Sequence, residues 1–318
     1  MAAKVVGLAL GGGGLRGLAH VGVIQVLSEA GLEADLVAGT SMGSLVAAFY
    51  ALGWSPETME ELSVRLRRED FYDPALKWRD LVPLAVKLVA SFYGWSRGQT
   101  KSPAGLLRGD KLETMVRRIT GDARWRDLQR PLAIMATDIL SACPVVFAPD
   151  AFGPAIAGSL PGAAVIGGAT LAEACRCSTA VPGVFAPRRL EGRLLVDGGV
   201  SDNVPVAVLR AMGADLVVAV DVAKPPRREA DALWEVVAAS FEVVSQARVR
   251  EQLSRHADVV IRPVVPAFSL LDTGHAAESI EAGRAAARSA LPDILRQLDR
   301  PQPDRGFTAA PAAIPPPA

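Results

Sequence analysis

The first fifty residues alternate two short apolar runs with two helical patterns, and this alternation limits the fold more than any other feature. Val5 to Leu10 is an apolar run, and a glycine run from Gly11 to Gly14 follows it. A helical pattern from Leu18 to Ala30 leads to a second apolar run, which ends in the turn Gly39–Gly43 before a helical pattern from Ser44 to Leu52. This order is typical of a parallel α/β sheet.

The rest of the chain continues the alternation. We predict strands at Pro131–Thr137, Val145–Ala148, Leu194–Val196, Leu216–Val220 and Val259–Ile261, and helices at Leu171–Ser178, Val204–Met212, Leu233–His256 and Ala276–Leu298. Residues 151–168 are poor in charge and rich in Gly, Ala and Pro, so we expect a loop that lines a cleft. We place a single domain at residues 1–300, with its motif-bearing core at 5–220, and expect a disordered Pro- and Ala-rich tail at 301–318.

Composition excludes several classes of protein. The formal net charge is zero, so no overall field attracts nucleic acid. Cys143, Cys175 and Cys177 are too few for a disulfide framework, and their spacing is not that of a zinc site. We interpret them as reduced thiols and expect neither a metal nor another cofactor.

Two segments bear on contact with membranes. The sequence starts with Met-Ala-Ala-Lys and a strand, without an apolar signal region, and no stretch reaches ~18 uninterrupted apolar residues. We therefore expect a cytoplasmic protein, with any membrane contact peripheral, at the inner face. Residues 71–108 are apolar, aromatic and locally basic, which indicates a lid or a patch for anionic lipid, or alternatively a core helix with solvated cations at its ends.

The turn Gly39-Thr40-Ser41-Met42-Gly43 has the form of a nucleophile elbow. A serine at the tip of a sharp strand-to-helix turn presents its hydroxyl outside the sheet, and flanking glycines give the turn room. The alternative is an ordinary turn in which Ser41 only caps the following helix.

The glycine run admits two functions. Gly12-x-Gly14-x-x-Gly17 after a strand matches a dinucleotide fingerprint, with Glu33 or Asp35 as the ribose-binding acid, although these acids precede the second strand instead of ending it. Alternatively, the amides of the same loop hold the oxyanion that forms when a serine attacks an ester. The second interpretation requires the loop and the elbow to be neighbours at the carboxyl edge of the sheet.

A serine nucleophile needs a base. The histidines are His20, His256 and His275, and none has a local context that marks it as catalytic. The alternative is an aspartate, and Asp138, Asp197 and Asp221 each end an apolar run. Asp197 is distinguished by Gly198 and Gly199, which permit a tight turn that brings its carboxylate near another loop.

Three blocks in this order resemble the signature of the patatin-like phospholipases, above all the bacterial ones. They are Gly12-Gly13-Gly14-Leu15-Arg16-Gly17, Gly39-Thr40-Ser41-Met42-Gly43 and Asp197-Gly198-Gly199, and the stretch Cys175–Pro187 is also similar to that family. The resemblance covers roughly Val5 to Val220. It implies a three-layer α/β sandwich with a mostly parallel central sheet and helices on both faces.

The resemblance also implies a Ser-Asp dyad without histidine or metal, which hydrolyses acyl esters of phospholipids, lysophospholipids or neutral lipids. Ser41 is then the nucleophile, Asp197 the base, and the amides of Gly12, Gly13 and Gly14 the oxyanion hole. Arg16, Gly17, Gly39, Gly43, Gly198 and Gly199 support these motifs. Two alternatives stay open, namely a low-turnover regulatory or scaffolding protein on this fold and a Rossmann-type nucleotide-binding protein. The sequence does not indicate an oligomeric state.

Overall fold

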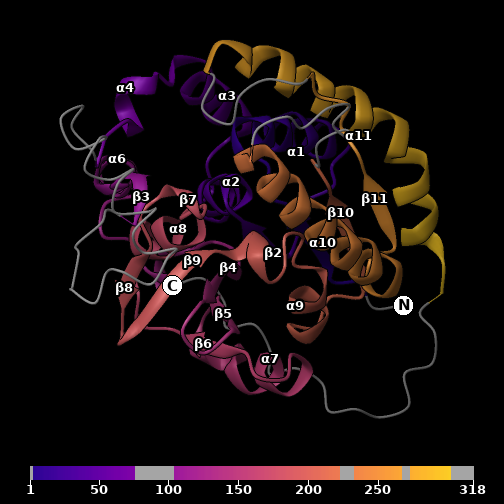
Figure 1. The fold of residues 1–318 in the computed structure, drawn as a ribbon. Helices are drawn as coiled ribbons and strands as arrows, with labels where there is room; N and C mark the ends of the chain where they lie inside the picture. The colour runs from indigo at the N-terminus through magenta and orange to yellow at the C-terminus, as the bar shows by residue number, and fades with distance from the viewer. Residues whose placement is uncertain (1–2, 76–103, 223–232, 267–272, 302–318) are drawn as a thin grey trace, which may run out of the picture.

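The computed structural model describes residues 3–75, 104–222, 233–266 and 273–301 (Figure 1). Most of the predicted lid or membrane segment at 71–108, and nearly all of the predicted tail at 301–318, lie outside these residues. The first elements are β1 (Val6–Leu10), the 3-10 helix η1 (Gly14–Leu18), α1 (Ala19–Glu29), β2 (Leu36–Thr40) and α2 (Met42–Ala51). They confirm the strand and helix order predicted for the first fifty residues.

Short elements follow, then the rest of the sheet. The middle of the chain forms α3 (Pro56–Arg65), α4 (Arg68–Phe71), β3 (Gly105–Leu107), α6 (Asp110–Thr120), β4 (Leu132–Asp138), β5 (Cys143–Phe147), α7 (Gly153–Ser159), β6 (Ala164–Ile166) and α8 (Leu171–Ser178). The last part forms β7 (Gly183–Phe185), β8 (Arg188–Leu190), β9 (Arg193–Asp197), α9 (Val206–Ala211), β10 (Leu216–Val220), α10 (Leu233–His256), β11 (Val259–Ile261) and α11 (Ala276–Asp299).

The central sheet is mixed and mostly parallel. Its main order is β11-β10-β1-β2-β4-β5-β6, and β9 also pairs with β4 and carries β8 on its other edge. The pairs β4–β5, β4–β9 and β8–β9 are antiparallel, whereas the other neighbours are parallel. A separate pair, β3–β7, lies outside this sheet.

Helices cover both faces of the sheet, as predicted. Leu8 and Leu10 of β1 pack into a core shared with α1, α2 and α11, while Ala9 between them packs with α9 on the opposite face. This follows from the alternation of side chains along a strand. In Figure 1, indigo α1 and α2 belong to the first helical layer and orange α9 to the second. The result is a three-layer α/β sandwich.

The prediction of a loop at residues 151–168 is wrong. This segment contains α7 and the edge strand β6, which pairs in parallel with β5. Ile156 is fully buried in the core on the α9 side of the sheet. The helix forms despite its small residues because Ile156 anchors it to this core, and such tertiary contacts override weak helix propensity.

Candidate active site

The nucleophile elbow has the geometry that the sequence predicts. Ser41 lies between β2 and α2 with φ 54 and ψ −125, a left-handed region that is strained for a residue with a side chain. A Cβ on Gly43 would lie 2.1 Å from the carbonyl oxygen of Leu10, and one on Gly39 would lie 2.4 Å from the carbonyl oxygen of Gly43. Both flanking positions of the elbow therefore require glycine.

Neighbouring groups hold the elbow in this conformation. The Ser41 N–H donates to Ser178 Oγ at 2.9 Å, and Ser44 Oγ donates to the Ser41 carbonyl at 2.6 Å. Ser178 ends α8 and is fully buried. Ser41 accepts no side-chain cap bond as N-cap of α2, so its hydroxyl does not serve the helix. The interpretation of Ser41 as a simple helix cap is therefore wrong.

The glycine loop and the elbow are neighbours at the carboxyl edge, because β1 and β2 pair in parallel. A Cβ on Gly12 would lie 3.1 Å from Ser41 Cβ, which shows how closely the loop approaches the elbow. Arg16, almost completely buried, donates from Nε to the Gly13 carbonyl at 3.2 Å. Burial lowers the pKa of Arg16 to about 10, partly offset by Glu242, so its guanidinium stays charged beneath the loop.

The three loop glycines differ in what their amides do. The Gly12 N–H donates to the Asn203 carbonyl at 3.1 Å, while Asn203 Nδ2 donates to the Gly12 carbonyl at 3.1 Å. Asn203 thus fixes Gly12 from both sides. The amides of Gly13 and Gly14, at the start of η1, have no partner among the described residues. Gly14 also lines the pocket next to Ser41.

Asp197 ends β9 and is buried beside the elbow. Its Oδ1 accepts the Gly199 N–H at 2.7 Å, whereas its Oδ2 makes no well-formed hydrogen bond to a described residue. Burial raises the pKa of Asp197 to about 6, and the Gly199 N–H and the Ser41 hydroxyl oppose this shift. The Ser41 hydroxyl therefore lies close enough to the Asp197 carboxyl to influence its pKa.

The remaining motif positions support these groups. Gly17 lies against Met42, and Gly198 lies against the main chain of Met135 in β4. The fully buried His20 contacts the Gly11 carbonyl through Nε2 at 2.7 Å, and burial lowers its pKa to about 4. A neutral imidazole that already binds the main chain is structural.

The other candidate bases are engaged elsewhere. His275 pairs with Glu278 at 3.0 Å at the start of α11, and His256 ends α10, where Arg210 binds its carbonyl. Burial alone would raise the pKa of Asp138, but hydrogen bonds from Ser141 and the Leu140 amide, with others, bring it below its usual value. Asp221 pairs with Arg262 at 3.5 Å. Among the candidates, the structure brings only Asp197 to the elbow.

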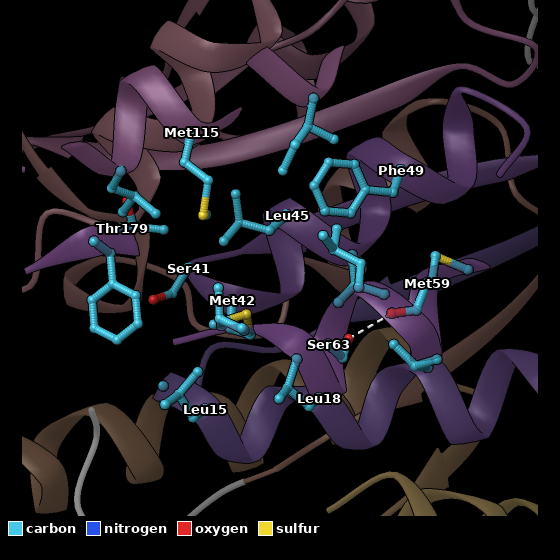
Figure 2. Close-up of a pocket in the computed structure, with 18 of the residues that line it drawn as sticks. Leu15, Leu18, Ser41, Met42, Leu45, Phe49, Met59, Ser63, Met115 and Thr179 are labelled. Carbon is cyan, nitrogen blue, oxygen red and sulfur yellow. Dashed lines mark hydrogen bonds between the residues drawn. The ribbon is translucent and has the colours of Figure 1, made fainter. Parts of the chain in front are cut away.

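A pocket opens in front of Ser41. Its walls are almost entirely apolar, and Figure 2 shows Ser41 at one end of it, with Leu15, Leu18, Met42 and Leu45 along its sides. The structure thus combines a strained serine, a buried carboxylate, two free amides and an apolar cavity. The sequence did not single out Ser178 or Asn203. The available signals were that Ser178 lies in Cys175–Pro187, the stretch that resembles the family, and that Asn203 follows Asp197-Gly198-Gly199 by four residues.

Comparison with known proteins decides the family. Residues 8–210 match the sequence model of the patatin-like phospholipase family. The chain belongs to this family. Patatin-like phospholipases are lipid acyl hydrolases, and the three sequence blocks that resemble them are the elbow, the glycine loop and the Asp197 turn described above.

Two relatives show the extent of the match. An uncharacterized NTE family protein of Mycobacterium tuberculosis (strain H37Rv) is 34% identical over 224 residues, covering 68% of this chain and 49% of that protein. Patatin-like phospholipase domain-containing protein 7 of Rattus norvegicus is 26% identical over 306 residues, covering 88% of this chain and 20% of that protein. The chain thus spans about half the length of the mycobacterial NTE family protein that it matches.

Among solved structures, human GIVD cytosolic phospholipase A2 aligns with a TM-score of 0.47 at 14% identity, covering 93% of this chain and 60% of that one. VipD from Legionella pneumophila aligns with a TM-score of 0.45 at 17% identity, covering 93% of this chain and 67% of that one. In the described part of this patatin-like chain, no helix combines the length and apolar character needed to cross a bilayer.

Proposed function

We propose that the chain is a serine lipid acyl hydrolase that cleaves carboxylic esters of phospholipids or lysophospholipids through Ser41 and Asp197. The observation that carries this proposal is the buried Asp197 carboxyl, whose Oδ1 is fixed by Gly199 while its other oxygen is left free beside Ser41. A base with one oxygen anchored and one available is suited to accept the proton of a serine hydroxyl.

The reaction has two steps. Asp197 accepts the hydroxyl proton as Ser41 Oγ attacks the acyl carbonyl, and the alcohol portion leaves with that proton. Water then gives a proton to Asp197 as it attacks the acyl-enzyme, and Asp197 passes that proton to Ser41 Oγ as the acyl–oxygen bond breaks, which releases the fatty acid and restores Ser41. The amides of Gly13 and Gly14 are the oxyanion donors in this proposal, because the Gly12 amide is already bonded to Asn203. Gly12 instead shapes the loop next to Ser41.

The Rossmann alternative has little support. Asp35 Oδ2 accepts the Val6 N–H at 2.7 Å, so this carboxylate lies at the amino end of β1. Glu33 pairs with Arg130. Both acids therefore lie at the edge of the sheet opposite the glycine loop, where they do not reach a ribose bound at that loop.

Covalent labelling with a fluorophosphonate tests the proposal. The wild-type protein should be labelled at Ser41, and Ser41→Ala should not be labelled. Asp197→Asn should react much more slowly. Ser279→Ala is a matched control, because Ser279 is buried in α11 and binds the His275 carbonyl. Labelling that persists in Ser41→Ala contradicts the assignment, and failure to hydrolyse any lipid ester despite labelling favours a low-turnover regulatory protein.

Peripheral contact with an anionic membrane is a separate proposal. It depends on residues 71–108, and binding to vesicles that contain anionic lipid should weaken as salt is added. As part of this proposal, the protein is located in the cytoplasm and binds the membrane at its inner face.

A further inference from the structure

One face of α2 runs along the pocket, starting from the nucleophile. Met42, Leu45, Val46 and Phe49 all line the cavity, and their spacing of three and four residues places them on one side of the helix. Ser41 is the N-cap of the same helix. The pocket therefore starts at Ser41 and runs along α2.

The end of the pocket opposite Ser41 is closed. Met59 of α3 is 1% exposed and Phe49 is 8% exposed, and Figure 2 shows both side chains at that end. The ring of Phe49 is backed by Trp54, with centroids 5.2 Å apart and planes 22° from parallel. A stacked pair of aromatic rings resists displacement, so this wall is firm.

The hydroxyl groups in the wall, apart from that of Ser41, are satisfied by main-chain carbonyls. Ser63 Oγ donates to the Met59 carbonyl at 2.7 Å, the bond drawn in Figure 2, and Thr179 Oγ1 donates to the Cys175 carbonyl at 2.9 Å. The remaining lining residues are apolar or glycine. Because these two hydroxyl protons are already donated, a carbonyl or ether oxygen on a ligand would lose its hydration without gaining a donor from either hydroxyl.

The length of this pocket follows from helix geometry. Phe49 comes eight residues after Ser41, a distance of ~12 Å along a helix that rises ~1.5 Å per residue. An extended hydrocarbon with bonds of ~1.5 Å advances ~1.3 Å per carbon, so ~12 Å holds about nine or ten carbons.

We propose that this pocket holds one unsubstituted acyl chain of about ten carbons, and that Phe49 and Met59 set that length. The inference rests on the proposed function, since it assigns the acyl group to the pocket in front of Ser41. It names the substrate class as medium-chain acyl esters.

A series of p-nitrophenyl esters from C4 to C16 tests the inference on the purified protein. In the wild type, kcat/KM should rise about fourfold per added methylene up to about C10, because each methylene leaves water for an apolar wall. It should level off or fall beyond that length. A wild-type optimum at C4 or at C16 would overturn the proposal.

Variants at the closed end should move the optimum. Met59→Ala and Phe49→Leu remove part of this wall, and the ratio of kcat/KM for C14 over C10 should rise at least tenfold. Val46→Phe fills the pocket midway, and its optimum should move below C10. Met212→Ala is the matched control, since Met212 is 2% exposed but packs on the opposite face of the sheet. A shift in Met212→Ala equal to that in Met59→Ala, or none in either variant of the wall, would overturn the proposal.

A binding measurement separates this inference from the proposed function. If the wild type hydrolyses none of the esters and is not labelled by fluorophosphonate, the proposed function fails. Calorimetry with C6 to C16 fatty acids on Ser41→Ala then decides the inference alone. Tightest binding near C10, shifted to longer chains by a second substitution Met59→Ala, supports it. Affinity that does not depend on chain length contradicts it.

Discussion

Thr40 and Asp197 lie opposite consecutive residues of β4. Thr40, the last residue of β2, pairs with Met135, and Asp197, the last residue of β9, pairs with Ala136. Because β2 is parallel to β4 and β9 is antiparallel to it, the two strands approach each other end to end along one edge of β4. Ser41 directly follows Thr40, so the register of β4 determines that Ser41 and Asp197 meet.

The pH dependence of hydrolysis should report the titration of Asp197. Burial raises the pKa of this carboxyl to about 6, and only its ionised form accepts a proton. We expect kcat/KM to fall about tenfold per pH unit below pH 6 and to be level above it. Steady-state kinetics from pH 4.5 to 8 on a soluble ester checks this. Asp202→Asn is the control, and loss of the inflection in that variant would show that Asp202, not Asp197, controls the rate.

The stability of the protein should depend on Asp202. Burial raises the pKa of Asp202 to about 7, against opposing effects of Arg248 and the Val204 N–H, and its Oδ1 has no partner among the described residues. The folded state then binds a proton more tightly than the unfolded state, so stability falls as pH rises from about 4 to about 7.

Asp202→Asn removes this penalty. Its gain in free energy of unfolding should be larger at pH 8 than at pH 5 by on the order of 2 kcal/mol. Denaturant unfolding at the two pH values measures the difference. A gain that is the same at both would mean that Asp202 does not titrate in this range.

Asn203→Ala should slow catalysis while changing substrate affinity little. Asn203 Nδ2 donates to the Gly12 carbonyl and so positions the loop whose next two amides are the proposed oxyanion donors. Loss of this bond should lower kcat by roughly 10- to 100-fold, because oxyanion stabilisation depends on the placement of its donors. An unchanged kcat, or an increase in KM alone, would argue against a positioning role.

Gly43→Ala should abolish the fold or destabilise it by more than about 3 kcal/mol, because the new Cβ would lie 2.1 Å from the Leu10 carbonyl oxygen. Thermal unfolding measures the loss. Gly158→Ala is the matched control, since a Cβ at this position of α7 meets no atom within 4 Å. Equal melting temperatures for the two variants would contradict the close packing of the elbow.

Several features that depend on residues close together in the chain could be predicted from the local sequence. The alternation of β1, α1, β2 and α2 follows from apolar periodicity and from the glycines that end each element. The elbow at Ser41 was predictable because close flanking contacts require glycine on both sides. The segment at 151–168 was mispredicted because α7 has one buried residue, Ile156, so the sequence shows no apolar periodicity there and the helix depends on tertiary packing.

The sequence by itself determined the α/β class, from the alternation of its first fifty residues, and it indicated the elbow of the proposed nucleophile Ser41 and the glycine loop, because each of these two motifs is a short local pattern. Only the tertiary structure decided that the Gly12 amide is bonded to Asn203, that His20 supports the main chain, and that the pocket ends at Phe49 and Met59. It also brought Asp197 to Ser41 from 156 positions away in the chain. The physical reason is that strand register and side-chain packing join distant residues, and neither is encoded in local periodicity.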